Sequence, residues 1–259
     1  MLISNIYKIN QSEQISHKFY SRLDKDENIS ILKTLRSAGS IKSLVSNNEI
    51  IHTLAKLARN INLIISEYPE NHEKRCREVN HWLNEKIKTL ESNKRGSDLN
   101  TFGTSVINDV NHNYKGKTTI VCIRENQPYK TDHAEIMKEL DDYCEIRDNN
   151  GRNVLKNINE CLNYNNYIKS KKEYFTSQIN EKCNTHNCKR SDYKIDDYCT
   201  LDKMDDTFRE INCDVLYKKA QIQETVPTIK ERSPLEIGFF IIVSFILFYL
   251  FILFLEKVK

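Results

Sequence analysis

The sequence contains few of the residues that make tight turns. Its 259 residues include 6 glycines and 4 prolines, the two residue types that most often punctuate the turns of β folds. No glycine-rich loop of the kind that cradles phosphate groups is present. This scarcity favours a mainly α-helical fold over a many-stranded one and gives no support to a nucleotide-binding site.

A strong excess of charge of either sign is also missing. The chain has 39 lysines and arginines against 36 aspartates and glutamates, a formal net charge of +3. The two signs are mixed along the sequence, as they are on the solvated faces of helices. A nucleic-acid-binding protein would gather its basic residues on one face, so we expect no nucleic-acid partner.

No group of residues has the pattern of a catalytic or cofactor-binding site. The 7 histidines are scattered, and no cysteine lies in a sequence context that marks a nucleophile. Acidic residues do occur in adjacent pairs, but neighbours on a helix do not face each other, so we interpret them as solvated surface. These pairs are Asp141-Asp142, Asp196-Asp197 and Asp205-Asp206. His81 is interpreted as a helix-surface residue, and the sequence predicts no enzyme, no catalytic residue, no metal centre and no cofactor.

The N-terminus lacks the apolar segment of a secretory signal peptide. It reads MLISNIYKINQSEQ, with no hydrophobic core of the required length. The chain does contain one long apolar run, residues 237–255, which reads IGFFIIVSFILFYLFILFL and carries no charge. At about 1.5 Å per residue, a helix of this length crosses the roughly 30 Å hydrocarbon core of a bilayer. We therefore predict a transmembrane helix at 237–255 that lies in the lipid bilayer and also serves as the targeting signal.

The predicted span divides the chain into parts. Residues 1–220 form a helical domain that contains all the cysteines, 221–234 a membrane-proximal linker, and 256–259 a short tail beyond the span. Basic residues flank both ends of the span, so they do not define its orientation. They are Lys230, Arg232, Lys257 and Lys259.

Apolar residues in the first third of the chain recur at the three- and four-residue steps of a helix face. Short helices are predicted around 15–23 and 31–35, with Ala38-Gly39-Ser40 as a break. Ser46 and Glu49 match a capping box that opens a longer helix, which Pro69 ends. The face of that helix consists of Ile50, Leu54, Leu57, Ile61 and Ile64, and the next helix has Cys76, Val79, Leu83, Ile87 and Leu90.

The periodicity fails between residues 92 and 130, where Gly96, Gly103 and Gly116 fall, and we predict an irregular segment there. Within it, 118–123 is either a short strand or a buried loop. Asp132 and Glu135 then resemble an N-cap pair before a helix with Ile136, Leu140 and Tyr143 on one face.

The last third of the domain is predicted to hold two further helices. Apolar positions seven apart indicate a long helix packed on the domain after Gly151; they are Val154, Cys161, Ile168 and Phe175. Their partner positions are Ile158, Asn165, Lys172 and Ile179, and only half of these are apolar, which argues against a coiled coil. A final amphipathic helix is expected over 201–215.

Aromatic side chains could mark either a binding surface or the core. Trp82, the single tryptophan, lies beside an apolar stripe, so we expect it to pack into the core. The tyrosine-rich run of Tyr164, Tyr167 and Tyr174 is open to the same two interpretations.

Eight cysteines lie between the first 75 residues and the apolar run. They are Cys76, Cys122, Cys144, Cys161, Cys183, Cys188, Cys199 and Cys213. An even number in the polar domain of a membrane-anchored chain suggests disulfides formed in an oxidising compartment. Eight cysteines allow 105 pairings, so no pairing is assigned. Because Cys183, His186, Cys188 and Cys199 are close in sequence, zinc ligation by reduced thiolates is the alternative.

One stretch of the sequence resembles a known family. Residues 76–83, CREVNHWL, resemble the C-x-x-L-N-x-W-L signature of the Plasmodium interspersed repeat (PIR) superfamily, which includes the VIR proteins. Val79 departs from the usual leucine, a mild exchange on the same apolar face. The cysteines from Cys144 onward and the single apolar run are also similar, so the resemblance covers roughly residues 40–259. It marks Asn80, Trp82 and Leu83 as core residues of the signature.

The resemblance implies a disulfide-stapled helical ectodomain plus one C-terminal transmembrane helix. It implies a non-enzymatic variant antigen with roles in antigenic variation, immune evasion and interaction with a host-cell protein ligand. It also implies export to the membrane or surface of the infected red cell. The tail of 256–259 is shorter than is usual in that family. The alternative is a tail-anchored intracellular membrane protein with reduced, zinc-binding cysteines, and a membrane-bound enzyme is a remote third.

Overall fold

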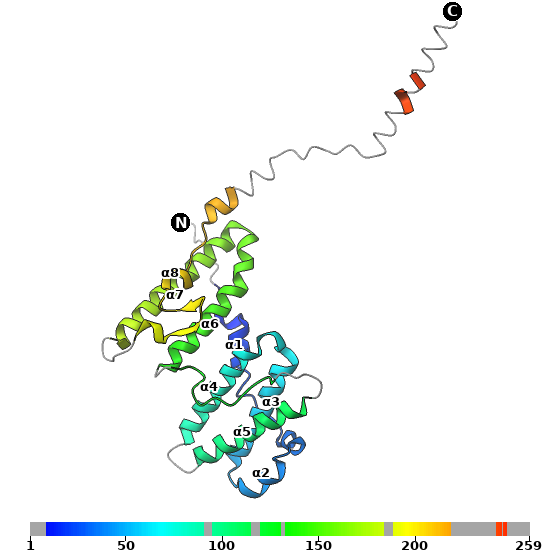
Figure 1. The fold of residues 1–259 in the computed structure, drawn as a ribbon, viewed down its shortest axis with the longest axis vertical. Helices are drawn as coiled ribbons and strands as arrows, with labels where there is room; N and C mark the ends of the chain where they lie inside the picture. The colour runs from blue at the N-terminus through cyan, green and yellow to red at the C-terminus, as the bar shows by residue number, and fades with distance from the viewer. Residues whose placement is uncertain are drawn as a thin grey trace, which may run out of the picture. The chain divides into compact units, whose positions relative to one another are not determined.

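The structure is a computed structural model that describes residues 9–90, 95–114, 120–130, 133–183, 189–218, 242–244 and 246–247. The chain divides into two compact units, residues 1–211 and 212–259. The first unit holds all the labelled helices and strands (Figure 1).

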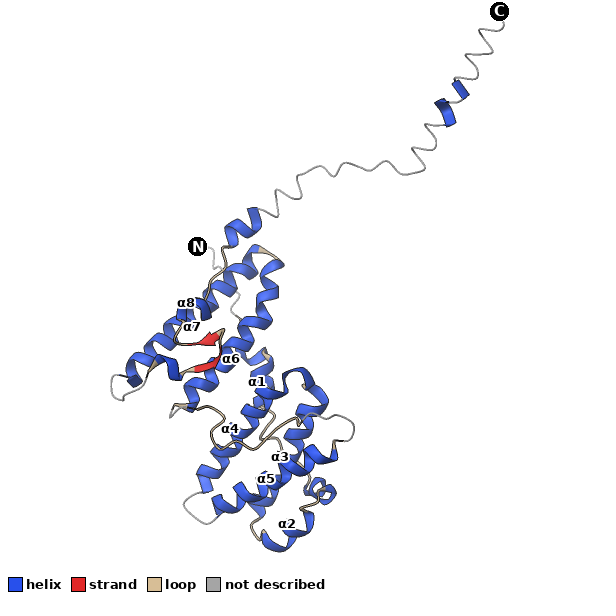
Figure 2. Ribbon diagram, viewed as in Figure 1, coloured by secondary structure: helices blue, strands red, loops and turns tan. Residues whose placement is uncertain are grey.

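The first unit is mainly α-helical, as the sequence predicts (Figure 2). Its helices are α1 (Ile15–Tyr20), α2 (Ala38–Leu44), α3 (Asn48–Glu67), α4 (His72–Leu90), α5 (Arg95–Asn113), α6 (Ala134–Gly151), α7 (Ile158–Cys183) and α8 (Met204–Thr207). Strands β1 (Lys194–Asp196) and β2 (Cys199–Thr200) form an antiparallel pair. Short 3-10 helices cover Gln11–Glu13, Ile29–Thr34, Pro69–Asn71, Arg152–Leu155 and Arg190–Asp192.

Helix α3 forms where the apolar periodicity predicts it. The five apolar residues of its predicted face are at most 1% exposed, because that face packs against α4 and α5. The helix ends at Glu67, two residues before Pro69. Its cap differs from the prediction: Asn47, not Ser46, is the N-cap, and its side chain accepts a hydrogen bond from the Ile50 amide at 3.2 Å.

Helix α5 occupies 95–113 of the segment 92–130 that is predicted to be irregular, so the prediction is wrong there, whereas it is confirmed for 120–130, which hold neither helix nor strand. Gly103 lies in the middle of the helix, where a Cβ atom would come within 3.2 Å of a Leu83 methyl group. The glycine therefore lets α5 approach α4 closely, although glycine lowers helix propensity. The buried face of α5 does follow a helical spacing, with Leu99, Gly103, Val106 and Val110 at steps of four, three and four.

Two other predictions near the N-terminus need correction. Ala38-Gly39-Ser40 opens α2 instead of breaking a helix, and no atom lies within 4 Å of a Cβ placed on Gly39. Residues 29–34 form a 3-10 helix in place of an α-helix.

The second half of the unit is built around α6 and α7. The seven-residue series from Val154 to Phe175 is at most 1% exposed, which confirms a long helix packed on the domain. Tyr143 of α6 stacks with Phe208 at 4.6 Å and with Tyr167 at 5.9 Å between ring centroids. Tyr164 and Tyr167 are buried, so these two tyrosines belong to the core. The helix predicted over 201–215 is wrong, because a turn at 201–203, the short α8 and an irregular stretch at 209–212 occupy most of that segment.

Of the second unit, residues 212–218, 242–244 and 246–247 are described, and all of them except Asn212 are helical. Over the part of the chain that the structure describes, no helix has the length and apolarity needed to cross a membrane. The predicted span at 237–255 falls mostly outside the described residues, so it stays a prediction. The predicted linker at 221–234 and tail at 256–259 lie wholly outside them.

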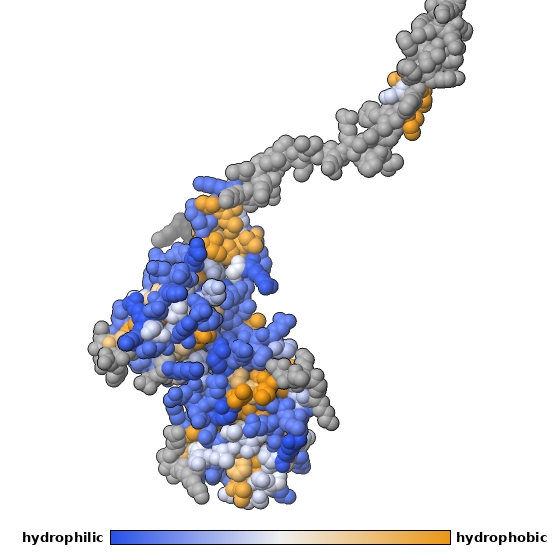
Figure 3. All heavy atoms as spheres, viewed as in Figure 1, coloured by the Kyte–Doolittle hydropathy of each residue, from blue (hydrophilic) through white to orange (hydrophobic). Residues whose placement is uncertain are grey.

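The surface of the first unit is mostly hydrophilic in the view of Figure 3, with hydrophobic atoms gathered in a few patches.

Candidate functional site

The sequence signature lies on α4, and its residues face two directions. Cys76 and Asn80 are one helical turn apart and both face the segment 120–130, which we call the clamped loop. Leu83 faces α5 and is fully buried beside Gly103. Trp82 is 2% exposed, and its indole N–H donates to the Asp24 carboxylate at 3.1 Å. The expectation that Trp82 packs into the core is thus met.

Cys76 and Asn80 hold the clamped loop by a covalent bond and by hydrogen bonds. Cys76 forms a disulfide with Cys122. The Asn80 side chain donates to the Ile123 carbonyl at 2.8 Å and accepts from the Glu125 amide at 3.0 Å. Asn80 is 0% exposed, so these bonds supply its buried amide with the hydrogen-bond partners that water would otherwise provide. The disulfide joins α4 to a loop and not to another helix.

Arg124 fastens the same loop from the other side. Its guanidinium donates to three asparagine side chains, Asn80, Asn84 and Asn100, and to the Glu125 carbonyl. These bonds use all five N–H groups of the arginine. No carboxylate is among the partners, and burial lowers the pKa of Arg124 to about 10. Arg124 therefore holds the clamped loop through hydrogen bonds to uncharged groups and not through an ion pair.

Further amide contacts complete the clamp. Asn111 of α5 accepts from the Val121 and Cys122 amides at 3.1 and 3.3 Å, and Asn84 donates to the Asn126 carbonyl at 2.9 Å. Residues 120–123 are a loop and not a strand. The loop nevertheless exposes Ile120 by 60% and Ile123 by 59%.

A buried network of charges lies between α4 and α6. Lys74, Arg75, Glu78 and Asp141 are each at most 4% exposed. Lys74 Nζ lies 2.6 Å from Asp142 and 3.1 Å from Glu78, and Arg75 Nη1 lies 2.5 Å from Glu78. Buried charges need such partners because removal from water costs several kcal/mol per ion. The network is what holds the α4 signature helix to α6.

The charge network also includes residues that the sequence did not lead us to expect there. Arg75 also pairs with Glu145, and Arg77 pairs with Asp141 at 2.9 Å. Tyr129 of the clamped loop donates to Asp141 at 3.2 Å, so the loop and the network are joined. The interpretation of Asp141-Asp142 as solvated surface is wrong for Asp141. The sequence feature that could have indicated this network is the pair Lys74 and Glu78, which lie four residues apart on one face of α4, opposite acidic residues on another helix.

His81 also departs from its prediction as a surface residue. It is 7% exposed and packs edge-on against Tyr129, with 5.5 Å between ring centroids. Burial lowers its pKa, so the imidazole is neutral near pH 7. His81 helps to seat the clamped loop and carries no catalytic arrangement.

A model of the Plasmodium vivax Vir protein family matches residues 14–233. The chain belongs to this family. The match includes the signature at 76–83 and every labelled helix and strand. A comparison with curated proteins and another with solved structures found no match.

The cysteines of this Vir protein are oxidised throughout the described residues, none of which is a free cysteine. Cys144 on α6 bonds Cys199 on β2, and Cys161, Cys183 and Cys213 are disulfide-bonded as well. Cys188 and His186 lie outside the described residues. Because Cys183 and Cys199 are both disulfide-bonded, the zinc site proposed for the 183–199 cluster loses two of its four candidate ligands. No metal-binding group of histidines, cysteines or carboxylates occurs among the described residues.

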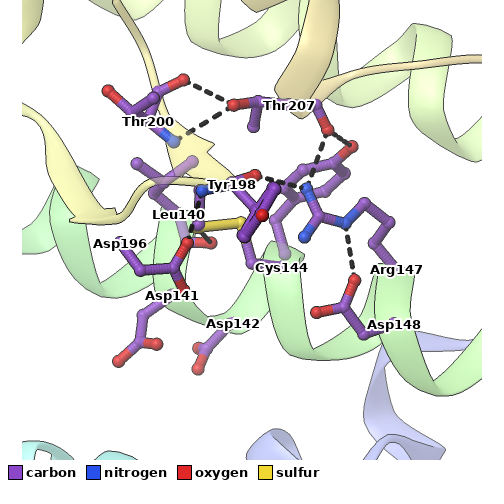
Figure 4. The surroundings of a disulfide bond; sticks show 12 residues. Leu140, Asp141, Asp142, Cys144, Arg147, Asp148, Asp196, Tyr198, Thr200 and Thr207 are labelled. Carbon is purple, nitrogen blue, oxygen red and sulfur yellow. Dashed lines mark hydrogen bonds and ion pairs between the residues drawn. A yellow bond between two sulfur atoms is a disulfide. The ribbon is translucent and has the colours of Figure 1, made fainter. Parts of the chain in front are cut away.

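The Cys144–Cys199 disulfide anchors the β hairpin to α6 (Figure 4). Around it, Arg147 donates to the carbonyls of Tyr198 and Thr207 at 2.9 and 3.0 Å. Asp141 and Asp142 point away from this disulfide, on the side of α6 that faces the charge network (Figure 4). Helix α6 of the Vir domain is therefore joined to the β hairpin by a disulfide on one side and to α4 by ion pairs on the other.

Replacing Asn80 with alanine in this Vir protein is expected to lower the free energy of unfolding by about 2–3 kcal/mol. The change removes three hydrogen bonds of the Asn80 side chain, to the Ile123 carbonyl, from the Glu125 amide and from Arg124, and each contributes about 0.5–1.5 kcal/mol. Urea unfolding measures the loss, and hydrogen exchange should rise at 122–126. Asn166 of α7, outside the clamp and exposed, is the control position for the same substitution, and equal losses at both positions would contradict the clamp.

The charge network should make stability depend on pH. Burial raises the pKa of Glu78 from 4.5 to about 7, although Lys74 and Arg75 pull it down. A carboxyl whose pKa is raised on folding favours the folded state below its unfolded pKa and loses that contribution as the pH rises through the folded value. Stability should therefore fall by up to about 3 kcal/mol between pH 4.5 and pH 7. The Glu78→Gln variant should flatten this slope in urea unfolding, and an unchanged slope would show that another group titrates.

Proposed function

We propose that the protein is a non-enzymatic, membrane-anchored variant antigen with a disulfide-stapled helical ectodomain. The observation that carries the proposal is the family match together with the bonded cysteines: Cys76–Cys122 and Cys144–Cys199 are formed in the folded domain. Disulfides form and persist in oxidising compartments. The alternative of a cytosolic tail-anchored protein with reduced cysteines is therefore disfavoured.

The disulfides, hydrogen bonds and ion pairs around α4 are compatible with a surface that varies in sequence. Asn80, Trp82 and Leu83 of the signature and most of the charge network are buried, while the bonds of α4 hold a loop whose outer side chains face solvent. Substitution of exposed loop residues usually costs little stability. Export to the membrane or surface of the infected red cell, antigenic variation, immune evasion and contact with a host-cell protein are the roles that this proposal includes. Anchoring is assigned to the apolar run at 237–255.

Two measurements on protein from the native cell test the proposal. Alkylation with and without reduction counts the free thiols, and we expect few or none of the eight cysteines to react before reduction. Extraction with alkaline carbonate should leave the chain in the membrane pellet, because a transmembrane helix resists it. Reaction of all eight cysteines would place the domain in a reducing compartment, and release by carbonate would overturn the anchor.

A further inference from the structure

An exposed apolar stripe lies where the chain turns from α6 into α7. Its members are Leu155, which is 71% exposed, Ile158 at 40% and Leu162 at 48%. Ile158 and Leu162 are four residues apart and share one side of α7, and Leu155 ends the 3-10 helix that leads into it. Figure 3 shows hydrophobic surface gathered over this end of the unit. Single exposed leucines are ordinary, but three exposed apolar side chains within eight residues form a patch.

Positive charge accompanies the stripe. Arg152 and Lys156 flank Leu155 and are exposed, and none of the ion pairs found among the described residues includes either of them. Glu160, the acidic residue nearest in sequence, lies about half a turn from both Ile158 and Leu162, on the other side of the helix. We call Arg152, Leu155, Lys156, Ile158 and Leu162 the α7 patch. Apolar side chains flanked by basic ones have the composition of a surface that lies on anionic lipid.

The chain leaves the first unit next to this patch. Asn165, one turn after Leu162, donates to the Ile211 carbonyl at 2.7 Å and accepts from the Ile211 amide at 2.9 Å. Ile211 is the last residue of the first unit. The exit of the chain is thus pinned to the same side of α7 as the stripe, since residues 158, 162 and 165 are four and three apart.

The length of chain beyond the exit keeps the patch near a membrane. Residues 212–236 separate Ile211 from the predicted span, which is 25 residues, and a chain of that length cannot exceed about 90 Å. A bilayer is therefore always within reach of the domain, whatever other partners it meets. Tethering of this kind raises the effective concentration of even a weak binding surface.

We propose that the α7 patch docks the domain onto the anionic phospholipid surface of the membrane that holds its anchor. Leu155, Ile158 and Leu162 enter the interface between headgroups and acyl chains, and Arg152 and Lys156 contact lipid phosphates. Docking fixes which faces of the domain point away from the membrane. The proposal rests on the proposed function, because it needs the anchor at 237–255.

Hydroxyl-radical footprinting of the full chain in lipid vesicles tests the docking. In vesicles of phosphatidylcholine with phosphatidylserine, oxidation of the three stripe residues should fall several-fold compared with vesicles of phosphatidylcholine alone. Two basic residues near an anionic surface shift the docked fraction by on the order of tenfold or more. Leu44 of α2, which is 68% exposed, is the internal control and should oxidise equally in both.

A charge variant completes the test. Arg152→Gln with Lys156→Gln should abolish the difference between the two kinds of vesicle without changing the oxidation of Leu44. Equal oxidation of the stripe in both kinds of vesicle would overturn the docking. Protection of the stripe that survives in the charge variant would also overturn it, because the patch would then be covered by another part of the protein and not by anionic lipid. Release of the chain from the same vesicles by alkaline carbonate would overturn the anchor instead, so the two failures are distinct.

Discussion

Replacing Arg75 with methionine is expected to lower the free energy of unfolding by about 3–5 kcal/mol, the usual cost of removing one partner from a buried ion pair. The Arg75 side chain is 0% exposed and pairs with Glu78 and Glu145. Its guanidinium also lies 5.1 Å from the ring centre of Phe19 and 5.4 Å from that of Tyr68. Methionine keeps most of the packing but leaves buried carboxylates with one cation fewer. Urea unfolding of the full chain in a mild detergent measures the loss.

Two further variants separate the buried charge from other effects of the substitution. Arg22→Met breaks the Arg22–Glu67 pair, whose side chains are 30% and 44% exposed, and should cost less than about 1 kcal/mol. Adding Glu78→Leu to Arg75→Met removes a stranded carboxylate and should recover part of the loss. A loss at Arg75 no larger than that at Arg22 would contradict a stabilising role for the network.

Removing either of the two placed disulfides is expected to lower the free energy of unfolding by about 2–5 kcal/mol. The Cys76–Cys122 and Cys144–Cys199 bonds join residues 46 and 55 positions apart. Loops of such similar length predict nearly equal losses of about 4 kcal/mol in the chain-entropy model. The double variants Cys76→Ala/Cys122→Ala and Cys144→Ala/Cys199→Ala test this, since both cysteines of a pair are removed together. Thermal unfolding unchanged by either double variant would contradict a stapling role for that bond.

The two bonds should differ in how fast they are reduced. Cys76 is partly exposed, whereas Cys199 is 0% exposed and its partner Cys144 is 6% exposed. Thiol exchange needs access to a sulfur atom, so limited reduction of the folded protein should open Cys76–Cys122 first. Mass spectrometry of the alkylated protein identifies the order, and earlier opening of Cys144–Cys199 would show that this part of the unit opens locally.

The signature acquires a physical meaning from these contacts. Cys76 and Asn80 fasten the clamped loop, Leu83 lies against Gly103 of α5, and Trp82 bonds Asp24 near the start of the chain. The four residues of the motif reach three different segments, so α4 is the part of the domain to which these segments are attached.

The sequence by itself determined the features that depend on local periodicity. The apolar steps of α3 and α4, the stop at Pro69 and the long α7 all follow from which side chains recur on one face. The family was also readable from the short run at 76–83. These signals survive because they need only neighbours along the chain.

Only the tertiary structure decided the rest. Gly103 appeared to break a helix because glycine is a poor helix former, yet the close approach of Leu83 favours it there. Asp141 and His81 are polar residues that any sequence pattern assigns to the surface, but Arg77 and Tyr129 cover them from distant segments. Partners of this kind, and the choice of Cys122 and Cys199 as disulfide partners, are set by contacts between residues far apart in the chain. A buried charged side chain is stable only when it contacts partners that pair with it, and the sequence around that side chain does not show which distant residues those partners are.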